Sequence, residues 1–260
     1  MMKRFVLLAA ILFPLALSAA PAAAQLTQAQ QDAHAAALTA EKYRGDLFYT
    51  ALNASAAAGN IADTLKVLAD GVNNKVGAED PREVALQWLL DNTFDQNDQA
   101  KINAMYFKML ADLEIQRASS FQQMGRVAPY TDATEMALRA IMTYEILAIT
   151  DAERCDDPSV SKIVEDSVVP TYRDLSYSYT IVTKERFDIL SYYSSEYERL
   201  KNDRPVNVFL CSKGDKAKAD PKFKPKDLDA AEWTKKRNEL RGLYKNLWSE
   251  TYYTFKPKAQ

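Results

Sequence analysis

Apolar residues recur at intervals of three or four along most of the chain, and this period constrains the fold more than any other feature of the sequence. The longest run follows Pro170. Nine positions from Tyr172 to Leu200 keep the spacing, and only Arg186 among them is not apolar. A rise of about 1.5 Å per residue makes this one predicted helix of about 30 residues, roughly 45 Å long.

Helix-capping residues mark where further helices begin. Asp80 is followed by a proline and, three residues on, by a glutamate, as at many helix starts. Asp132 and Asp229 each stand three residues before a glutamate, and Asn60 directly precedes an apolar stripe. These patterns predict helix starts at four further places.

Glycine is scarce, with seven residues in 260, which leaves few of the tight turns that β-hairpins need. One short stretch near 204–211 alternates apolar and polar residues, and an isolated strand cannot form a sheet. The sequence therefore predicts an all-α fold, either a multi-helix bundle or an irregular helical array. We expect about seven or eight helices and one short extended segment near 204–211.

Residues 1–24 are typical of a secretory signal peptide. Lys3 and Arg4 precede an apolar run over residues 5–20, and three alanines then offer a cleavage site before Gln25. The run is shorter than the roughly 20 residues that span a bilayer, so a retained anchor is the weaker alternative. The alanine-rich composition favours a Gram-negative bacterium and predicts export to the periplasm.

Residues 25–260 are predicted to form a single helical domain, with 25–42 packed loosely and a Lys/Pro-rich loop over 212–226. Charge is uneven along this part of the chain. Residues 25–211 carry 18 basic and 28 acidic residues, whereas 212–260 carry 13 and 7. The basic C-terminal part suits an anionic surface or a partner protein of the cell envelope. We expect no nucleic-acid partner and no transmembrane segment in the mature chain.

Cys155 and Cys211 are the only cysteines, and an even pair in an exported chain predicts a disulfide. Free or intermolecular thiols are the alternative. A bridge requires that an extended 204–211 segment runs back beside the helices. It also requires the two Cα atoms to lie within about 7 Å of each other.

Catalytic motifs are few. His34 is the single histidine, and the phosphate-binding loops and the nucleophile elbow are missing from the sequence. We therefore expect no cofactor and no metal site. Ser159 and Lys162 have the Ser-x-x-Lys spacing, in which a neutral lysine can activate the serine hydroxyl. The companion motifs of such enzymes are missing, so these residues support only an alternative, an envelope hydrolase.

Four tyrosines on the predicted long helix define a tyrosine stripe that serves either as core or as a binding surface: Tyr172, Tyr179, Tyr193 and Tyr197. The core is the more usual place for such side chains.

The C-terminal segment 228–258 mixes cations with aromatic residues, including Trp233, Lys236, Arg237 and Trp248. Helices at a membrane interface have this composition, and so do ordinary helices that bury their aromatic side chains. We take the ordinary helix as the main interpretation and a peripheral membrane protein as the alternative. The whole sequence thus predicts an exported, non-catalytic binding or interaction protein of the cell envelope.

Overall fold

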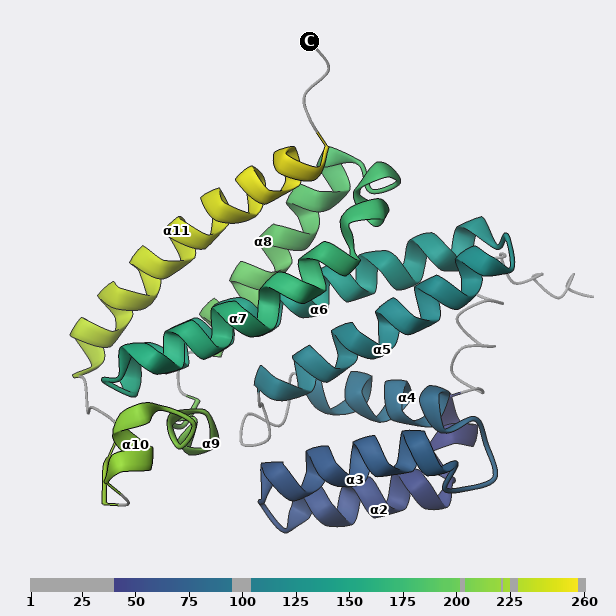
Figure 1. Cartoon of the computed structure of the whole chain (residues 1–260), viewed down its shortest axis with the longest axis horizontal. Helices are drawn as coiled ribbons and strands as arrows, with labels where there is room; N and C mark the ends of the chain where they lie inside the picture. Colours follow the sequence, from purple (N-terminus) through teal and green to yellow (C-terminus); the bar gives the residue numbers. More distant parts are fainter. Residues whose placement is uncertain (1–39, 95–103, 202–203, 221, 225–228, 257–260) are drawn as a thin grey trace, which may run out of the picture. The chain divides into compact units, whose positions relative to one another are not determined.

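The computed structural model describes residues 40–94, 104–201, 204–220, 222–224 and 229–256. Over these residues the fold is all-α, without strands, and a disulfide joins Cys155 to Cys211 (Figure 1). The predicted signal peptide and His34 lie outside the described residues. Residues 40–260 group into one compact unit, and the predicted domain start at residue 25 stays a prediction.

The described helices keep the helical period of the sequence. They are α2 (Leu47–Ala57), α3 (Ile61–Asn74), α4 (Pro81–Thr93), α5 (Ala104–Gln123), α6 (Val127–Arg154), α7 (Pro158–Asp174), the 3₁₀-helix η2 (Ser176–Thr180), α8 (Lys184–Leu200), α9 (Val208–Cys211), α10 (Asp215–Ala219) and α11 (Ala230–Phe255).

Three of the four predicted helix starts are confirmed. Asn60 caps α3, Asp80 caps α4, and Asp229 caps α11, each by accepting backbone N–H groups of the first turn. The prediction at Asp132 is wrong, because α6 begins five residues earlier and runs through it.

The prediction of a single long helix after Pro170 is wrong as well. Pro170 lies inside α7, which ends at Asp174, and α8 begins only after Thr183, whose hydroxyl oxygen accepts the backbone N–H of Arg186. The 3₁₀ turn between the two helices places the Tyr179 ring against rings of α8 and α11. The apolar spacing continues across the break, so the period does not reveal it.

The extended segment predicted near 204–211 is half as long as expected. Residues 204–207 have no helical structure, but Val208–Cys211 forms the one-turn helix α9 because Asn207 accepts the N–H of Leu210 and caps it. The predicted loop 212–226 likewise contains the short helix α10.

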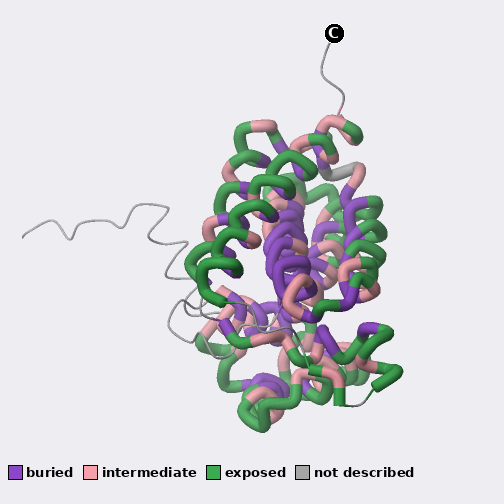
Figure 2. Tube along the Cα trace, turned by 90° about the vertical axis from the view of Figure 1, so that its left-hand side faces the viewer, coloured by how far each residue is buried: buried purple, intermediate pink, exposed green. Residues whose placement is uncertain are grey.

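The core is built around α6, which buries sixteen of its residues and packs against α5, α7, α8 and α11. A helix that is apolar on nearly all sides needs neighbours on all sides, and these four helices supply them. Figure 2 shows the buried residues along the inner helices and the exposed residues on the outer faces. Helices α2, α3 and α4 pack on one another and, through α4, on α5.

Candidate ligand-binding site

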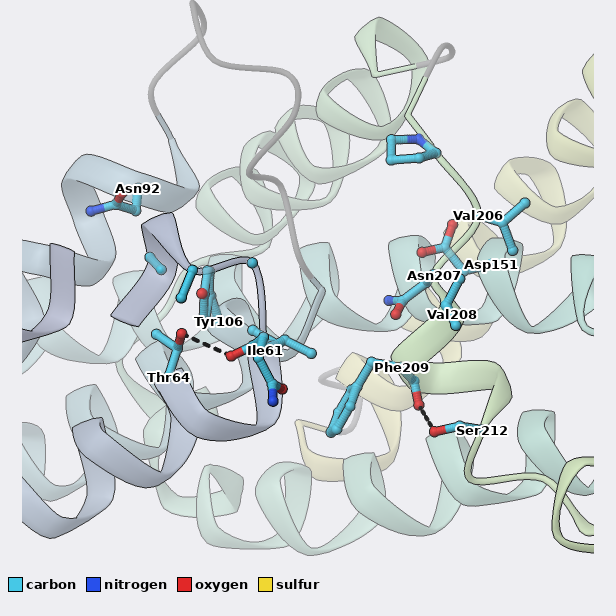
Figure 3. Close-up of a pocket in the computed structure, with 15 residues that line it drawn as sticks. Ile61, Thr64, Asn92, Tyr106, Asp151, Val206, Asn207, Val208, Phe209 and Ser212 are labelled. Carbon is cyan, nitrogen blue, oxygen red and sulfur yellow. Dashed lines mark hydrogen bonds between the residues drawn. The ribbon is translucent and has the colours of Figure 1, made fainter. Parts of the chain in front are cut away.

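A cavity of about 520 Å³ lies between the turn that joins α2 to α3 and the segment 205–212 (Figure 3). Its lining residues come from five separate stretches of the chain: Ala56, Ala58, Gly59, Asn60, Ile61, Thr64, Asn92, Tyr106, Asp151, Pro205, Val206, Asn207, Val208, Phe209 and Ser212. The volume falls within the range of about 300–1,000 Å³ that is usual for small-molecule sites.

The α2–α3 turn forms the first wall. Gly59 has a φ of +77°, a backbone conformation that favours glycine, and a side chain at this position would meet no atom within 4 Å. Asn60 then caps α3, and the buried Thr64 hydroxyl donates to the Asn60 carbonyl at 3.1 Å. The turn is thereby fixed from both sides, with Ile61 facing the cavity (Figure 3).

The floor rests on Trp88, which is fully buried in α4. The Tyr106 ring packs edge-on against Trp88 at 5.1 Å between ring centroids, and the indole N–H donates to Asn53 at 3.0 Å. Asn92 donates its side-chain N–H to the Trp88 carbonyl at 2.7 Å. Tyr106 and Asn92 therefore hold fixed positions at the cavity.

The facing wall is the segment 205–212. Val208 is 68% exposed, and Val206 and Phe209 are half-buried beside it. The Lys213 ammonium lies 4.5 Å from the centroid of the Phe209 ring. The disulfide of Cys211 with Cys155, with Cα atoms 5.1 Å apart, ties this wall to the end of α6, as the sequence predicted.

A buried ionic cluster anchors the start of the same wall. The Arg204 side chain is 4% exposed and reaches Asp151 on α6 at 2.8 Å and Glu198 on α8 at 3.0 Å. It also donates to the Thr150 hydroxyl. Because Asp151 lines the cavity and Arg204 directly precedes Pro205, this cluster links the cavity wall to the core.

Glu198 is fully buried and binds three arginines. Arg237 Nε reaches its Oε1 at 2.6 Å, and Arg241 donates to its Oε2. Burial opposes ionisation of the carboxyl, but the guanidinium groups of Arg204, Arg237 and Arg241 hold the pKa of Glu198 below its ordinary value. The glutamate therefore stays charged and keeps α8, α11 and the cavity wall together.

The described lining of the cavity contains few titrating groups. Asp151 is the one carboxylate among its described lining residues, and it is already paired with Arg204. Burial raises the pKa of Tyr106, which keeps its hydroxyl neutral. Across the described part of the chain, no three His, Cys, Asp or Glu residues are grouped so that they could hold a metal ion.

Ser159 has a structural role in this geometry. Its hydroxyl donates to Asp157 at 2.8 Å and accepts the backbone N–H of Asp215 at 2.8 Å. Lys162 lies on the exposed side of α7, and no hydrogen bond to Ser159 is recorded within the described chain. The contact holds α10 against α7, where a side chain on Gly214 would come within 2.4 Å of Asp157.

The tyrosine stripe divides between the core and the surface. Tyr172, Tyr179 and Tyr197 are buried, and Tyr193 is 53% exposed. The Tyr197 hydroxyl donates to the Thr93 carbonyl, and that of Tyr172 to Glu145 at 2.8 Å. Three of the four residues are therefore core, which is the main interpretation from the sequence.

Most of the residues proposed for membrane contact are also buried in the protein. Trp233, Arg237 and Trp248 are buried against the core, and Lys236 pairs with Glu153 at 3.2 Å. No helix among the described residues is long and apolar enough to cross a bilayer.

Sequence reasoning missed most of the cavity. Tyr106 belongs to an apolar stripe that predicts only core, and Asn92 and Arg204 lie in no motif. The two asparagine caps were available signals, since Asn60 and Asn207 each begin a helix that borders the cavity. No known protein family, no curated protein and no solved structure matches the chain.

Proposed function

We propose that this chain is an exported, non-catalytic binding protein of the cell envelope that holds a small molecule in the cavity between the α2–α3 turn and the segment 205–212. The observation that carries the proposal is the cavity itself. It combines a volume of about 520 Å³ with walls that are braced by the disulfide, the Arg204 cluster and the Trp88 floor. Such bracing lowers the entropy lost when a ligand binds.

Export to the periplasm of a Gram-negative bacterium is part of the proposal. The charged start, apolar run and alanine-rich end of residues 1–24 support a signal peptide. The Cys155–Cys211 disulfide supports an oxidising compartment, because such bonds persist there and are rare in the cytosol. Mass spectrometry of the periplasmic protein tests this directly, and we expect a mature chain that begins at or near Gln25.

A binding role fits the cavity better than catalysis does. General acid–base work needs a titrating group within reach of the substrate, and the one carboxylate here is committed to a guanidinium. The alternative hydrolase would use Ser159, whose hydroxyl holds α10 in place.

Two exposed valines allow a matched test. Val208 is 68% exposed at the cavity, and Val169 on α7 is 66% exposed and is not among the residues that line it. We expect Val208→Trp to fill the cavity mouth, while Val169→Trp adds the same side chain elsewhere. A library of small metabolites is screened by ligand-observed NMR against the mature protein and both variants.

The expected result is at least one ligand that binds the wild type and Val169→Trp and is lost in Val208→Trp. The proposal would be contradicted if every ligand found binds Val208→Trp as tightly as it binds the wild type. It would also be contradicted if the screen finds no ligand.

A further inference from the structure

We propose that the cavity takes an uncharged ligand that carries hydroxyl or acetamido groups at its edge and has apolar ring faces, the chemistry of an N-acetylated sugar. This inference rests on the proposed binding function and adds the ligand class to it. It depends on three properties of the lining: its charge, its hydrogen-bonding groups and the placement of its apolar side chains.

The lining offers no free charge to an ionic ligand. No lysine, arginine or histidine is among its described residues, and the Asp151 carboxylate is 3% exposed and paired with Arg204 at 2.8 Å. The arginines behind the wall are bound to Glu198 and cannot turn toward the cavity. An ionic ligand would lose its hydration here without gaining a counter-charge, whereas a neutral ligand avoids that loss.

The polar lining consists of amides and hydroxyls whose donors are already used within the protein. Asn92 donates to the Trp88 carbonyl at 2.7 Å, Thr64 to the Asn60 carbonyl at 3.1 Å, and Ser212 to the Phe209 carbonyl at 2.8 Å. The side-chain oxygens of Asn92 and Ser212 keep lone pairs that can accept hydrogen bonds, whereas Thr64 is fully buried and its hydroxyl also contacts that of Ser55 at 3.2 Å. A ligand that supplies O–H or N–H donors fits this arrangement.

Apolar side chains lie on both walls. Ala56, Ala58 and Ile61 come from the α2–α3 side, and Val206, Val208 and Phe209 come from the facing segment. A flat molecule between the two walls would place its apolar faces against these side chains and its polar edge toward the amides. A sugar ring combines apolar C–H faces with a polar edge, and the N–H of an acetamido group can donate to the Asn92 side-chain oxygen.

Three disaccharides on one scaffold test the charge of the ligand. They are the disaccharide of N-acetylglucosamine, its de-N-acetylated diamine, and a disaccharide of the same size that carries a uronic acid. Binding to the mature protein is measured by isothermal titration calorimetry at pH 6, where the amines are protonated and the uronic acid is ionised.

We expect the N-acetylated disaccharide to bind and both charged probes to bind at least tenfold more weakly. Val208→Trp should weaken binding at least tenfold, and Val169→Trp should leave it unchanged. In Asn92→Asp, the affinity for the cationic probe should approach or exceed the affinity for the neutral probe. The substitution places a carboxylate on the wall with almost the same shape as the amide.

A charged probe that binds as tightly as the neutral one would overturn the inference. Failure of all three probes would also overturn it, and the proposed function would still stand if the metabolite screen finds another ligand that Val208→Trp excludes. If neither experiment finds a ligand that is sensitive to Val208→Trp, both proposals fail.

Discussion

Two glutamates on neighbouring helices, Glu145 on α6 and Glu198 on α8, both bind side chains of α11 and yet have opposite surroundings. Glu145 accepts hydrogen bonds from two neutral groups, the Tyr172 hydroxyl at 2.8 Å and the Trp248 indole N–H at 2.7 Å. Glu198 is bound instead by three guanidinium groups.

The partners decide the ionisation of the two carboxyls. Burial raises the pKa of Glu145 to about 7, although the bonds from Trp248 and Tyr172 favour the charged form. Burial acts in the same direction on Glu198, but its arginines outweigh it and the pKa falls below the ordinary value. Neutral donors are thus too weak to keep a buried carboxylate charged, and cations are strong enough.

The comparison bears on function because only one of the two clusters touches the cavity. The arginine cluster includes Arg204 and Asp151, so it fixes the start of the wall 205–212. Glu145 joins α6, α7 and α11, and it is not among the residues that line the cavity. We therefore expect changes at Glu198 to affect both stability and binding, and changes at Glu145 to affect the pH dependence of stability.

The largest effect is expected for Glu198→Gln. It leaves the buried Arg237 and the half-buried Arg241 without their counter-charge and Arg204 with Asp151 alone, and breaking a buried pair in this way costs about 3–5 kcal/mol. Urea denaturation measures the free energy of unfolding. Glu196→Gln is the matched control, because this glutamate forms its ion pair with Arg199 at the surface and its replacement should change stability little. Equal stabilities for the two variants would contradict the assigned role of the cluster.

A smaller loss in the free energy of unfolding is expected when Cys155 and Cys211 are both replaced by alanine. Closing a loop of 56 residues is typically worth about 2–4 kcal/mol, and the loss should also loosen the wall that carries Val208. Denaturation of the wild type with reductant should give the same midpoint as the double variant. A double variant as stable as the oxidised wild type would show that the Arg204 cluster holds the wall without the disulfide.

The smallest effect is a pH dependence with opposite signs at the two glutamates. The raised pKa of Glu145 makes its contribution fully present below about pH 4.5 and lost as the pH rises through 7, by about 1–3 kcal/mol. Burial also raises the pKa of Glu114 to about 7, which adds a loss in the same window. The lowered pKa of Glu198 contributes stability above about pH 4.5 that is lost as the pH falls through its folded value.

Unfolding free energies between about pH 2 and 8 test these signs, because the Glu198 loss falls below pH 4.5 and the Glu145 loss above it. In Glu145→Gln, the free energy of unfolding should fall less between pH 5 and 8 than in the wild type. Its decrease at acid pH should be unchanged. An unaltered slope in that variant would show that Glu145 does not titrate in this range.

The sequence predicts local structure well where one residue decides it. The caps at Asn60, Asp80 and Asp229 are examples, because a side chain that accepts N–H groups of the next turn acts within four residues. The break between α7 and α8 is not predicted, because the apolar residues keep the same spacing through the 3₁₀ turn. The disulfide is predictable because the chain offers a single pair of cysteines.

The candidate site could not be predicted because it depends on contacts between distant residues. Arg204 meets Asp151 across 53 positions, and Glu198 meets Arg237 across 39. Nothing in the local sequence around these residues distinguishes a buried ion pair from a solvated charge. The cavity has the same origin, since Tyr106 and Val208 line it together only after five stretches of the chain have packed.

The central claim is that the cavity beside Val208 binds a small molecule. Titration of the mature wild type, Val208→Trp and Val169→Trp with one ligand from the metabolite screen tests it most directly. We expect equal Kd values for the wild type and Val169→Trp and at least a tenfold higher Kd for Val208→Trp. Equal Kd values for all three proteins would contradict it.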